Sequence, residues 1–139
     1  MNPLERLLFV STDNDLQQKL SEVLSPNRYR IVEDIDAAKA LLNEGYDPNL
    51  LVVDLVLPKL TGAETLDQLQ QCCLPKVIPG IIMTTNDRLV LYSLARAPEL
   101  LGVMSKKGDP ILLFERISKL WDDYQAWQID GEDAVSFTS

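Results

Sequence analysis

Short apolar runs separated by polar turns follow one another along this chain, and they predict the strands of a parallel sheet. The runs at residues 7–10, 50–54 and 81–84 are almost continuously apolar, which is typical of strands buried on both faces. Residues 29–32 alternate between apolar and polar, as in a half-buried or edge strand, and residues 102–105 form a short fifth run. The pattern therefore predicts five strands.

Amphipathic segments lie between these runs and predict helices, because their apolar residues recur at helical spacing. The segments are residues 16–24, 34–44 (with Gly45 as a C-cap), 63–73 and about 87–96, and a last helix that starts near Pro110. Five βα units predict an α/β protein, with a flavodoxin-like (βα)5 three-layer sandwich and strand order 2-1-3-4-5. We place this single domain at residues 1–127 and predict a flexible acidic C-terminal tail at 128–139.

Composition narrows the classes of function. The chain has 139 residues and a formal net charge of -8, which argues against a nucleic-acid partner. It contains no histidine, which excludes imidazole catalysis and histidine-ligated metal. No apolar stretch has the length of a membrane span, so we expect a cytoplasmic protein with no membrane contact. The adjacent Cys72 and Cys73 are interpreted as ordinary helix-end thiols, with a reactive vicinal pair as the alternative.

Asp54 is the strongest candidate for chemistry. It closes the apolar run at residues 50–53, and a carboxylate at the end of a buried strand costs free energy unless a partner or a ligand uses it. In open α/β sheets, ligands gather at the carboxyl ends of the strands. Thr84 ends the fourth predicted strand, and Lys106 follows the fifth. The sequence therefore predicts that these three side chains meet at one edge of the sheet.

At these residues the chain resembles the receiver domains of bacterial response regulators. The likeness extends from Leu7 to about Trp121, and its strongest part is the segment from Leu51 to Pro58 with the following Gly62. Thr84 matches the position of the family's hydroxyl residue, and Lys106, after Gly102, matches its lysine.

The resemblance implies a division of roles among these residues. Asp54 would attack a phosphoryl donor and become an acyl phosphate. Lys106 would pair with Asp54 and then with the phosphoryl oxygens, and Thr84 would donate its hydroxyl to one of them. The alternative is that Asp54 is a strand-end cap, Thr84 a strand former and Lys106 a solvated charge.

The chain departs from the family where the family binds metal. Response regulators have two consecutive acids after the first strand, and here these positions hold Ser11 and Thr12. The remaining metal candidates are weak: Asp13, Asp54 and the backbone carbonyl of Val56. Mg²⁺ needs oxygen ligands that include at least one or two carboxylates, so we expect weak Mg²⁺ binding and slow phosphorylation.

Two further departures affect the end of the fifth strand. Val103 stands where the family has a switch aromatic, and Lys107 stands where the family usually has a proline. An alternative register would use Thr85 and Lys107; we prefer Thr84 and Lys106 because that register also aligns Gly102.

The predicted function is that of a response-regulator-like signalling module of a two-component phosphorelay, not an enzyme, that acts through protein–protein interaction with weak or absent Mg²⁺-dependent phosphorylation. A conventional phospho-accepting receiver is the alternative, and a flavodoxin-like cofactor binder is a remote one. We expect a sensor histidine kinase or another signalling protein as partner, with a homodimer as a further option. Trp121, Tyr124 and Trp127 are candidates for an interaction surface, although packing of the helix end is their plainest role.

Overall fold

The structure, a computed structural model, describes residues 4–84, 100–105 and 109–138, the last twelve of these as backbone only. Five parallel strands form one sheet in the order β2-β1-β3-β4-β5, as the sequence predicts. The strands are β1 (Leu7–Val10), β2 (Tyr29–Val32), β3 (Leu50–Asp54), β4 (Gly80–Thr84) and β5 (Leu100–Ser105). The predicted helix at about 87–96 lies outside the described residues.

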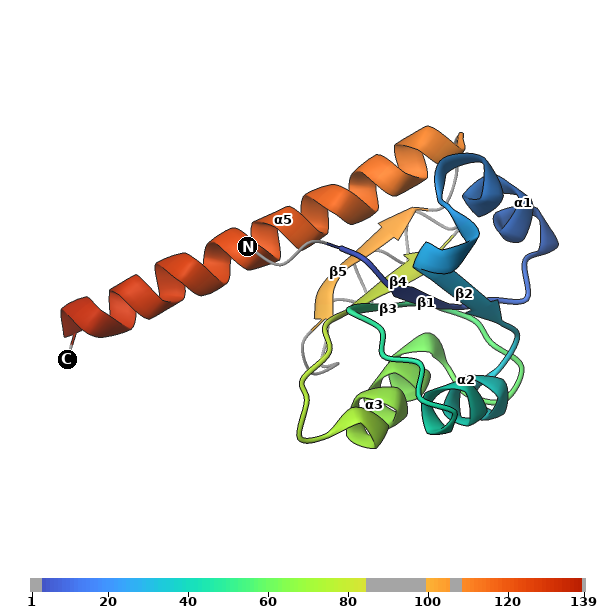
Figure 1. The fold of residues 1–139 in the computed structure, drawn as a ribbon, viewed down its shortest axis with the longest axis horizontal. Helices are drawn as coiled ribbons and strands as arrows, with labels where there is room; N and C mark the ends of the chain where they lie inside the picture. Colours follow the sequence, from blue (N-terminus) through green and yellow to red (C-terminus); the bar gives the residue numbers. More distant parts are fainter. Residues whose placement is uncertain (1–3, 85–99, 106–108, 139) are drawn as a thin grey trace.

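Helices cover both faces of the sheet (Figure 1). Helices α1 (Asn14–Val23) and α5 (Pro110–Thr138) pack together on one face, and α2 (Ile35–Asn43) and α3 (Gly62–Cys73) pack together on the other. A short 3-10 helix, η1 (Pro26–Arg28), connects α1 to β2. This is the three-layer arrangement that the alternation of strands and helices predicts.

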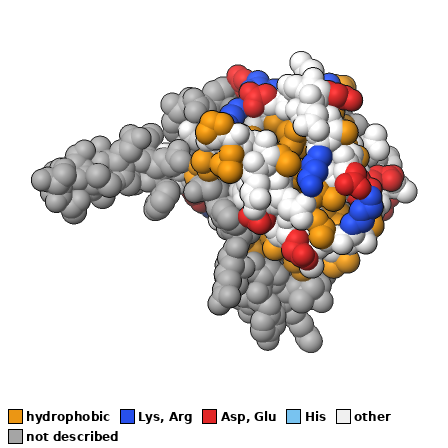
Figure 2. Space-filling model, turned by 90° about the horizontal axis from the view of Figure 1, so that it is seen from below, with side chains coloured by type: hydrophobic (Ala, Val, Ile, Leu, Met, Phe, Trp, Pro, Cys, Tyr) orange, Lys and Arg blue, Asp and Glu red, His pale blue; other side chains and the backbone are white. Residues whose placement is uncertain are grey.

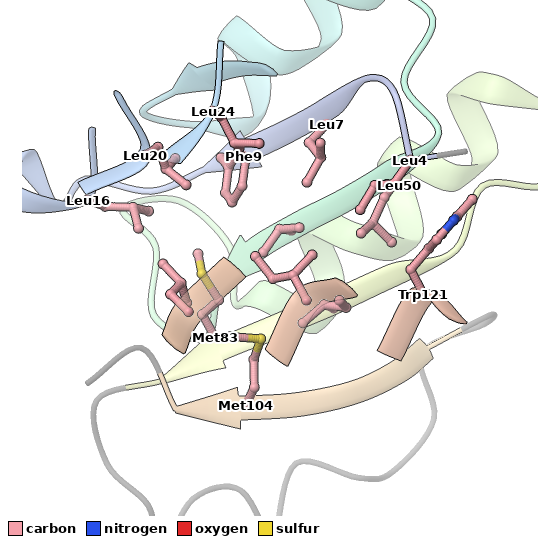
Figure 3. Close-up of a cluster of buried hydrophobic side chains, with 14 residues drawn as sticks. Leu4, Leu7, Phe9, Leu16, Leu20, Leu24, Leu50, Met83, Met104 and Trp121 are labelled. Carbon is pink, nitrogen blue, oxygen red and sulfur yellow. The ribbon is translucent and has the colours of Figure 1, made fainter. Parts of the chain in front are cut away.

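Two core clusters fill the space between the sheet and its helices, because successive residues of a strand point to opposite faces. In β1, Leu7 and Phe9 face α1 and α5, while Leu8 and Val10 face α2 and α3. The first core cluster, shown in Figure 3, contains Leu4, Leu7, Phe9, Leu16, Leu20, Leu24, Leu50, Val52, Ile81, Met83, Met104, Leu113, Ile117 and Trp121. The second core cluster contains Leu8, Val10, Ile35, Ala38, Leu51, Val53, Leu66, Leu69, Ile78 and Ile82.

Polar side chains cap the N-termini of α1, α2 and α3 and fix where these helices start. The carboxylate of Asp13 caps α1 by accepting the N–H of Asp15, and that of Asp34 caps α2 by accepting the N–H of Ala37. Thr61 and Glu64 form a capping box at the start of α3. Each cap satisfies backbone N–H groups that have no partner within the helix.

Gly45 ends α2 as the sequence predicts. Its φ is +104°, a value that L side chains rarely adopt. Its N–H donates to the carbonyl of Leu42 at 3.1 Å, and the N–H of Tyr46 donates to that of Leu41 at 3.2 Å. This pair of bonds is a Schellman motif, which satisfies carbonyls that the helix leaves open.

The C-terminal segment differs from the prediction in its secondary structure. The sequence predicts a tail from residue 128, whereas α5 continues without a break to Thr138 and projects beyond the rest of the domain (Figure 1). The segment contains Gly131, which costs about 1 kcal/mol relative to alanine in a helix, but it contains no proline, so nothing in it forbids helical backbone. The flexibility of this segment stays a prediction.

Figure 2 shows the face formed by α2 and α3, where hydrophobic side chains lie in separate groups among polar and charged ones. The exposed apolar residues elsewhere include Ile111 and Leu112 at the start of α5. Single exposed apolar residues are normal on a folded protein and need no special explanation.

Ile117 provides a test of how α5 is seated on the sheet. Its side chain is fully buried in the first core cluster, so Ile117→Ala should lower the free energy of unfolding by roughly 2–5 kcal/mol. Ile111→Ala, on the same helix but 60% exposed, should change it by less than about 0.5 kcal/mol. Urea unfolding followed by circular dichroism measures both, and equal effects would show that α5 packs in another orientation.

Candidate functional site at the carboxyl edge of the sheet

Three polar residues, Asp54, Thr84 and Ser11, lie at one edge of the sheet, because parallel strands end at the same edge. Asp54 is the last residue of β3, Thr84 is the last residue of β4, and Ser11 directly follows β1. All three are buried, with exposed fractions of 5%, 5% and 3%. Buried polar side chains side by side at this edge define the candidate site.

Ser11 is held directly beside Asp54 by the register of the sheet. Val10 pairs with Val53, and the backbone N–H of Ser11 donates to the carbonyl of Val32 at 2.9 Å. The Ser11 hydroxyl donates a hydrogen bond to Oδ2 of Asp54. The same hydroxyl oxygen accepts the backbone N–H of Asp13 at 3.0 Å.

The bond between Ser11 and Asp54 was not predicted from the sequence. In the sequence, Ser11 stands out as the replacement of an acid, and nothing there identifies it as a partner of Asp54. The sequence shows only that Ser11 and Asp54 each stand at the end of an apolar run; that the two runs pair in parallel and end together appears in the structure. A hydroxyl in that place is a natural donor to a buried carboxylate.

The loop after Asp54 turns back tightly onto the end of its own strand. The N–H of Leu55 donates to the carbonyl of Met83 at 2.8 Å, and the N–H of Gly62 donates to that of Leu55 at 2.8 Å. Val56 forms an antiparallel bridge with Thr61, and its side chain is 77% exposed. A Cβ on Gly62 would lie 2.3 Å from the carbonyl oxygen of Asp54, so only glycine fits where the loop closes.

Lys59 ties this loop to the start of α2. Its ammonium lies 3.6 Å from Oδ2 of Asp34 and hydrogen-bonds the carboxylate of Asp36. The hydrogen bond with Asp36 raises the pKa of Lys59, and the backbone N–H of Ala37 lowers the pKa of Asp34. Exposed ion pairs contribute little to stability, so Lys59 orients the loop rather than anchoring the fold.

The side chains at this edge fit a divalent metal poorly. The Asp13 carboxylate accepts the N–H of Asp15 at 3.0 Å, as the cap of α1, and Thr12 is exposed. Within the described residues, no three Asp, Glu, Cys or His side chains come together as a metal-binding group. Asp13, Asp54 and the carbonyl of Val56 therefore remain weak candidates for Mg²⁺, and we derive no chemical step through a metal here.

The end of β5 is described only up to Ser105, which pairs with Thr84. Lys106 lies outside the described residues, and so do Thr85 and Lys107 of the alternative register. The predicted pairing of Lys106 with Asp54 stays a prediction. Val103 is partly buried and packs against the second core cluster.

Two of the three candidate aromatic residues of α5 pack against the first core cluster. Trp121 is 6% exposed and lies in the first core cluster with Leu4 and Leu50 (Figure 3), in agreement with a packing role. Tyr124 is half-buried, with its ring centroid 6.1 Å from that of Trp121. The side chain of Trp127 lies outside the described ones. An interaction surface formed by all three aromatics would have to use a tryptophan that the core already buries.

Comparisons with known proteins agree with this geometry. The transcriptional regulatory protein CpxR of Klebsiella pneumoniae is 33% identical over 70 residues, which are 49% of this chain and 29% of that protein. The Mn²⁺-bound form of response regulator Rcp1 is 26% identical, with a TM-score of 0.61 over 84% of this chain and 91% of that one. No family model matches the chain.

Solved structures with lower identity share the fold. The signal receiver domain of an HD domain-containing protein from Pseudomonas fluorescens gives a TM-score of 0.69 at 20% identity, covering 92% of this chain and 95% of that one. A CheY-like receiver domain protein from Methanospirillum hungatei gives 0.64 at 22% identity, covering 89% and 98%.

The fold is that of a receiver-type α/β domain of the flavodoxin-like class. The chain is similar to receiver domains of response regulators, the family of two-component signalling that its motifs resemble, and it spans less than a third of the length of the curated relative that it matches. Among the helices of the described residues, none is long and apolar enough to cross a membrane.

Gly62 allows a test of how the loop controls the site. Gly62→Ala should displace the loop from Asp54 and lower the free energy of unfolding by roughly 1–3 kcal/mol. Gly45→Ala is a matched control, because its space is open but its positive φ penalises alanine. Both variants should lose stability in urea, but only Gly62→Ala should shift the NMR amide signals of Asp54 and Leu55. Unchanged signals in Gly62→Ala would contradict the close contact.

Proposed function

We propose that this chain is a receiver-type signalling module, not an enzyme, in which Asp54 holds the phospho-acceptor position and Mg²⁺-dependent phosphorylation is weak or absent. Its output then depends on contacts with other proteins. The proposal rests on the Ser11 hydroxyl, which donates a hydrogen bond to Asp54. In the family that the chain resembles, an acid occupies the position of Ser11.

The argument rests on what phosphoryl transfer requires. The transition state spreads negative charge over the phosphoryl oxygens, and a metal ion normally neutralises it. Mg²⁺ gives up its waters reluctantly and needs carboxylate ligands. With Ser11 and Thr12 at the two acidic positions and Asp13 occupied as a helix cap, the site offers fewer charged ligands. Weak metal binding therefore predicts slow phosphorylation.

A conventional phospho-accepting receiver is the second candidate, and the burial of Asp54 and Thr84 at adjacent strand ends favours it. In that mechanism a carboxylate oxygen of Asp54 attacks the phosphorus of the donor. The bond from phosphorus to the leaving group breaks, and the leaving group takes the electron pair. The Thr84 hydroxyl donates a hydrogen bond to a phosphoryl oxygen.

The proposed partners follow from the signalling role. A sensor histidine kinase or another signalling protein would dock on the domain, with a second copy of the chain as the alternative. The net charge of -8 favours proteins over nucleic acid as partners. We keep residues 1–127 as the receiver unit and 128–139 as a separate acidic segment, although α5 runs through the boundary between them. A cytoplasmic location fits these partners.

Acetyl phosphate tests the chemistry directly. Incubation of the wild type with acetyl phosphate and Mg²⁺, followed by intact mass, should show little or no added phosphoryl group. Ser11→Asp with Thr12→Asp should strengthen Mg²⁺ binding and increase incorporation, because hard charged ligands are restored. Asp54→Asn, introduced into the wild type or into the double variant, should abolish incorporation of the phosphoryl group. Complete phosphorylation of the wild type would favour the conventional receiver.

Partner capture tests the output. If contacts act without phosphorylation, Asp54→Asn should retain the proteins that the wild type captures from lysate, because it keeps the shape of the side chain. A chain that ends at Trp127 separates the domain from the acidic segment. Capture that is lost only in Asp54→Asn would contradict the proposal, and loss only on truncation would place the contact in residues 128–139.

A further inference from the structure

We propose that Ser11 is a positioning residue that couples Asp54 to the first turn of α1, so that the order of this turn depends on the Asp54 carboxylate. The inference deepens the proposed function, since it concerns the same site. It rests on a continuous set of contacts that runs from Asp54 to exposed residues.

The contacts form an ordered path. The Ser11 hydroxyl donates to Oδ2 of Asp54 and accepts the N–H of Asp13 at 3.0 Å. Asp13 then holds the start of α1, because its carboxylate accepts the N–H of Asp15 and its carbonyl accepts that of Leu16 at 3.2 Å. Two residues, Ser11 and Asp13, thus join the buried carboxylate to the helix.

The direction of the hydroxyl proton makes this path sensitive to Asp54. A serine hydroxyl has one proton to donate and accepts through its lone pairs. Because the N–H of Asp13 points at the oxygen, the proton is directed to the carboxylate. Hydrogen bonds to ionised acceptors are about twice as strong as neutral ones. Any change that removes charge from Oδ2 of Asp54 therefore weakens its hydrogen bond with Ser11, and the Ser11 side chain is then held less firmly beside the N–H of Asp13.

The path ends at the surface of the protein. Ser11 and Asp54 are buried, whereas Thr12, Asn14 and Asp15 are exposed. The coupling needs no metal ion, which agrees with the weak donor set at this edge.

Amide hydrogen exchange by NMR, measured without phosphoryl donor, tests the coupling. Ser11→Ala should speed exchange at Asp15 and Leu16 by about tenfold, the scale of a hydrogen bond to a charged group. Asp54→Asn should speed the same two amides, though less, while the amides of α2 stay at their wild-type rates. Thr12→Ala is the matched control, because it removes an exposed neighbouring hydroxyl and should change neither amide.

A double-mutant cycle identifies the route. If Ser11 carries the effect, adding Asp54→Asn to Ser11→Ala should change the exchange of Asp15 and Leu16 no further. Ser11→Cys, which keeps the volume but donates weakly, should resemble Ser11→Ala and serves if alanine disturbs folding. Unchanged amides in Asp54→Asn, or additive effects in the double variant, would overturn the coupling and leave Ser11 only as a local acceptor of the Asp13 N–H.

The same samples separate this inference from the proposed function. Acetyl phosphate and Mg²⁺ are added after the exchange measurement, and intact mass records phosphorylation. Full phosphorylation of the wild type would contradict the proposed function. The coupling would then still be decided by the exchange rates of Asp15 and Leu16. Absent coupling with little phosphorylation would defeat only the inference.

Discussion

The candidate site at the edge of the sheet depends on one hydrogen bond, which the Ser11 hydroxyl donates to the Asp54 carboxylate. It exists because β1 and β3 pair in parallel and end together, so that the residue after Val10 lies beside the last residue of β3. Both side chains are buried, and a buried polar group without a hydrogen bond would cost free energy. The fold therefore places the two side chains side by side, and the serine hydroxyl supplies a hydrogen bond to the buried Asp54 carboxylate.

The core explains why this geometry is rigid. Alternate residues of β1 and β3 enter the two core clusters, so a shift of one residue in the register would exchange the two faces of each strand. The loop after Asp54 is held in turn by Gly62, which allows the backbone to return to within contact of the Asp54 carbonyl. Packing on both faces and closure of the loop thus fix Asp54 from three sides.

Much of this arrangement could be predicted from the sequence, because strong local signals agree with the topology. The apolar run that Asp54 closes predicts the bounds of β3. Gly45 correctly predicts the end of α2, and Pro110 correctly predicts the start of α5. The length of α5 was not predicted, because an acidic segment without a strong apolar pattern gives no helix signal. The bond from Ser11 to Asp54 also depends on register between residues 43 positions apart, which composition and periodicity do not encode.

The exchange of an acid for serine also changes what the site requires electrostatically. Carboxylates gathered at one buried edge repel one another, and a metal ion normally compensates this repulsion. A neutral hydroxyl adds no charge and donates a hydrogen bond, so Asp54 gains a partner where the family would add a second anion. Under the proposed function, this edge is buried and ordered without a bound cation, and phosphorylation lacks the ion that would drive it. The same serine would then both satisfy the buried carboxylate and weaken its chemistry, which is the combination expected of a receiver fold that signals through contacts.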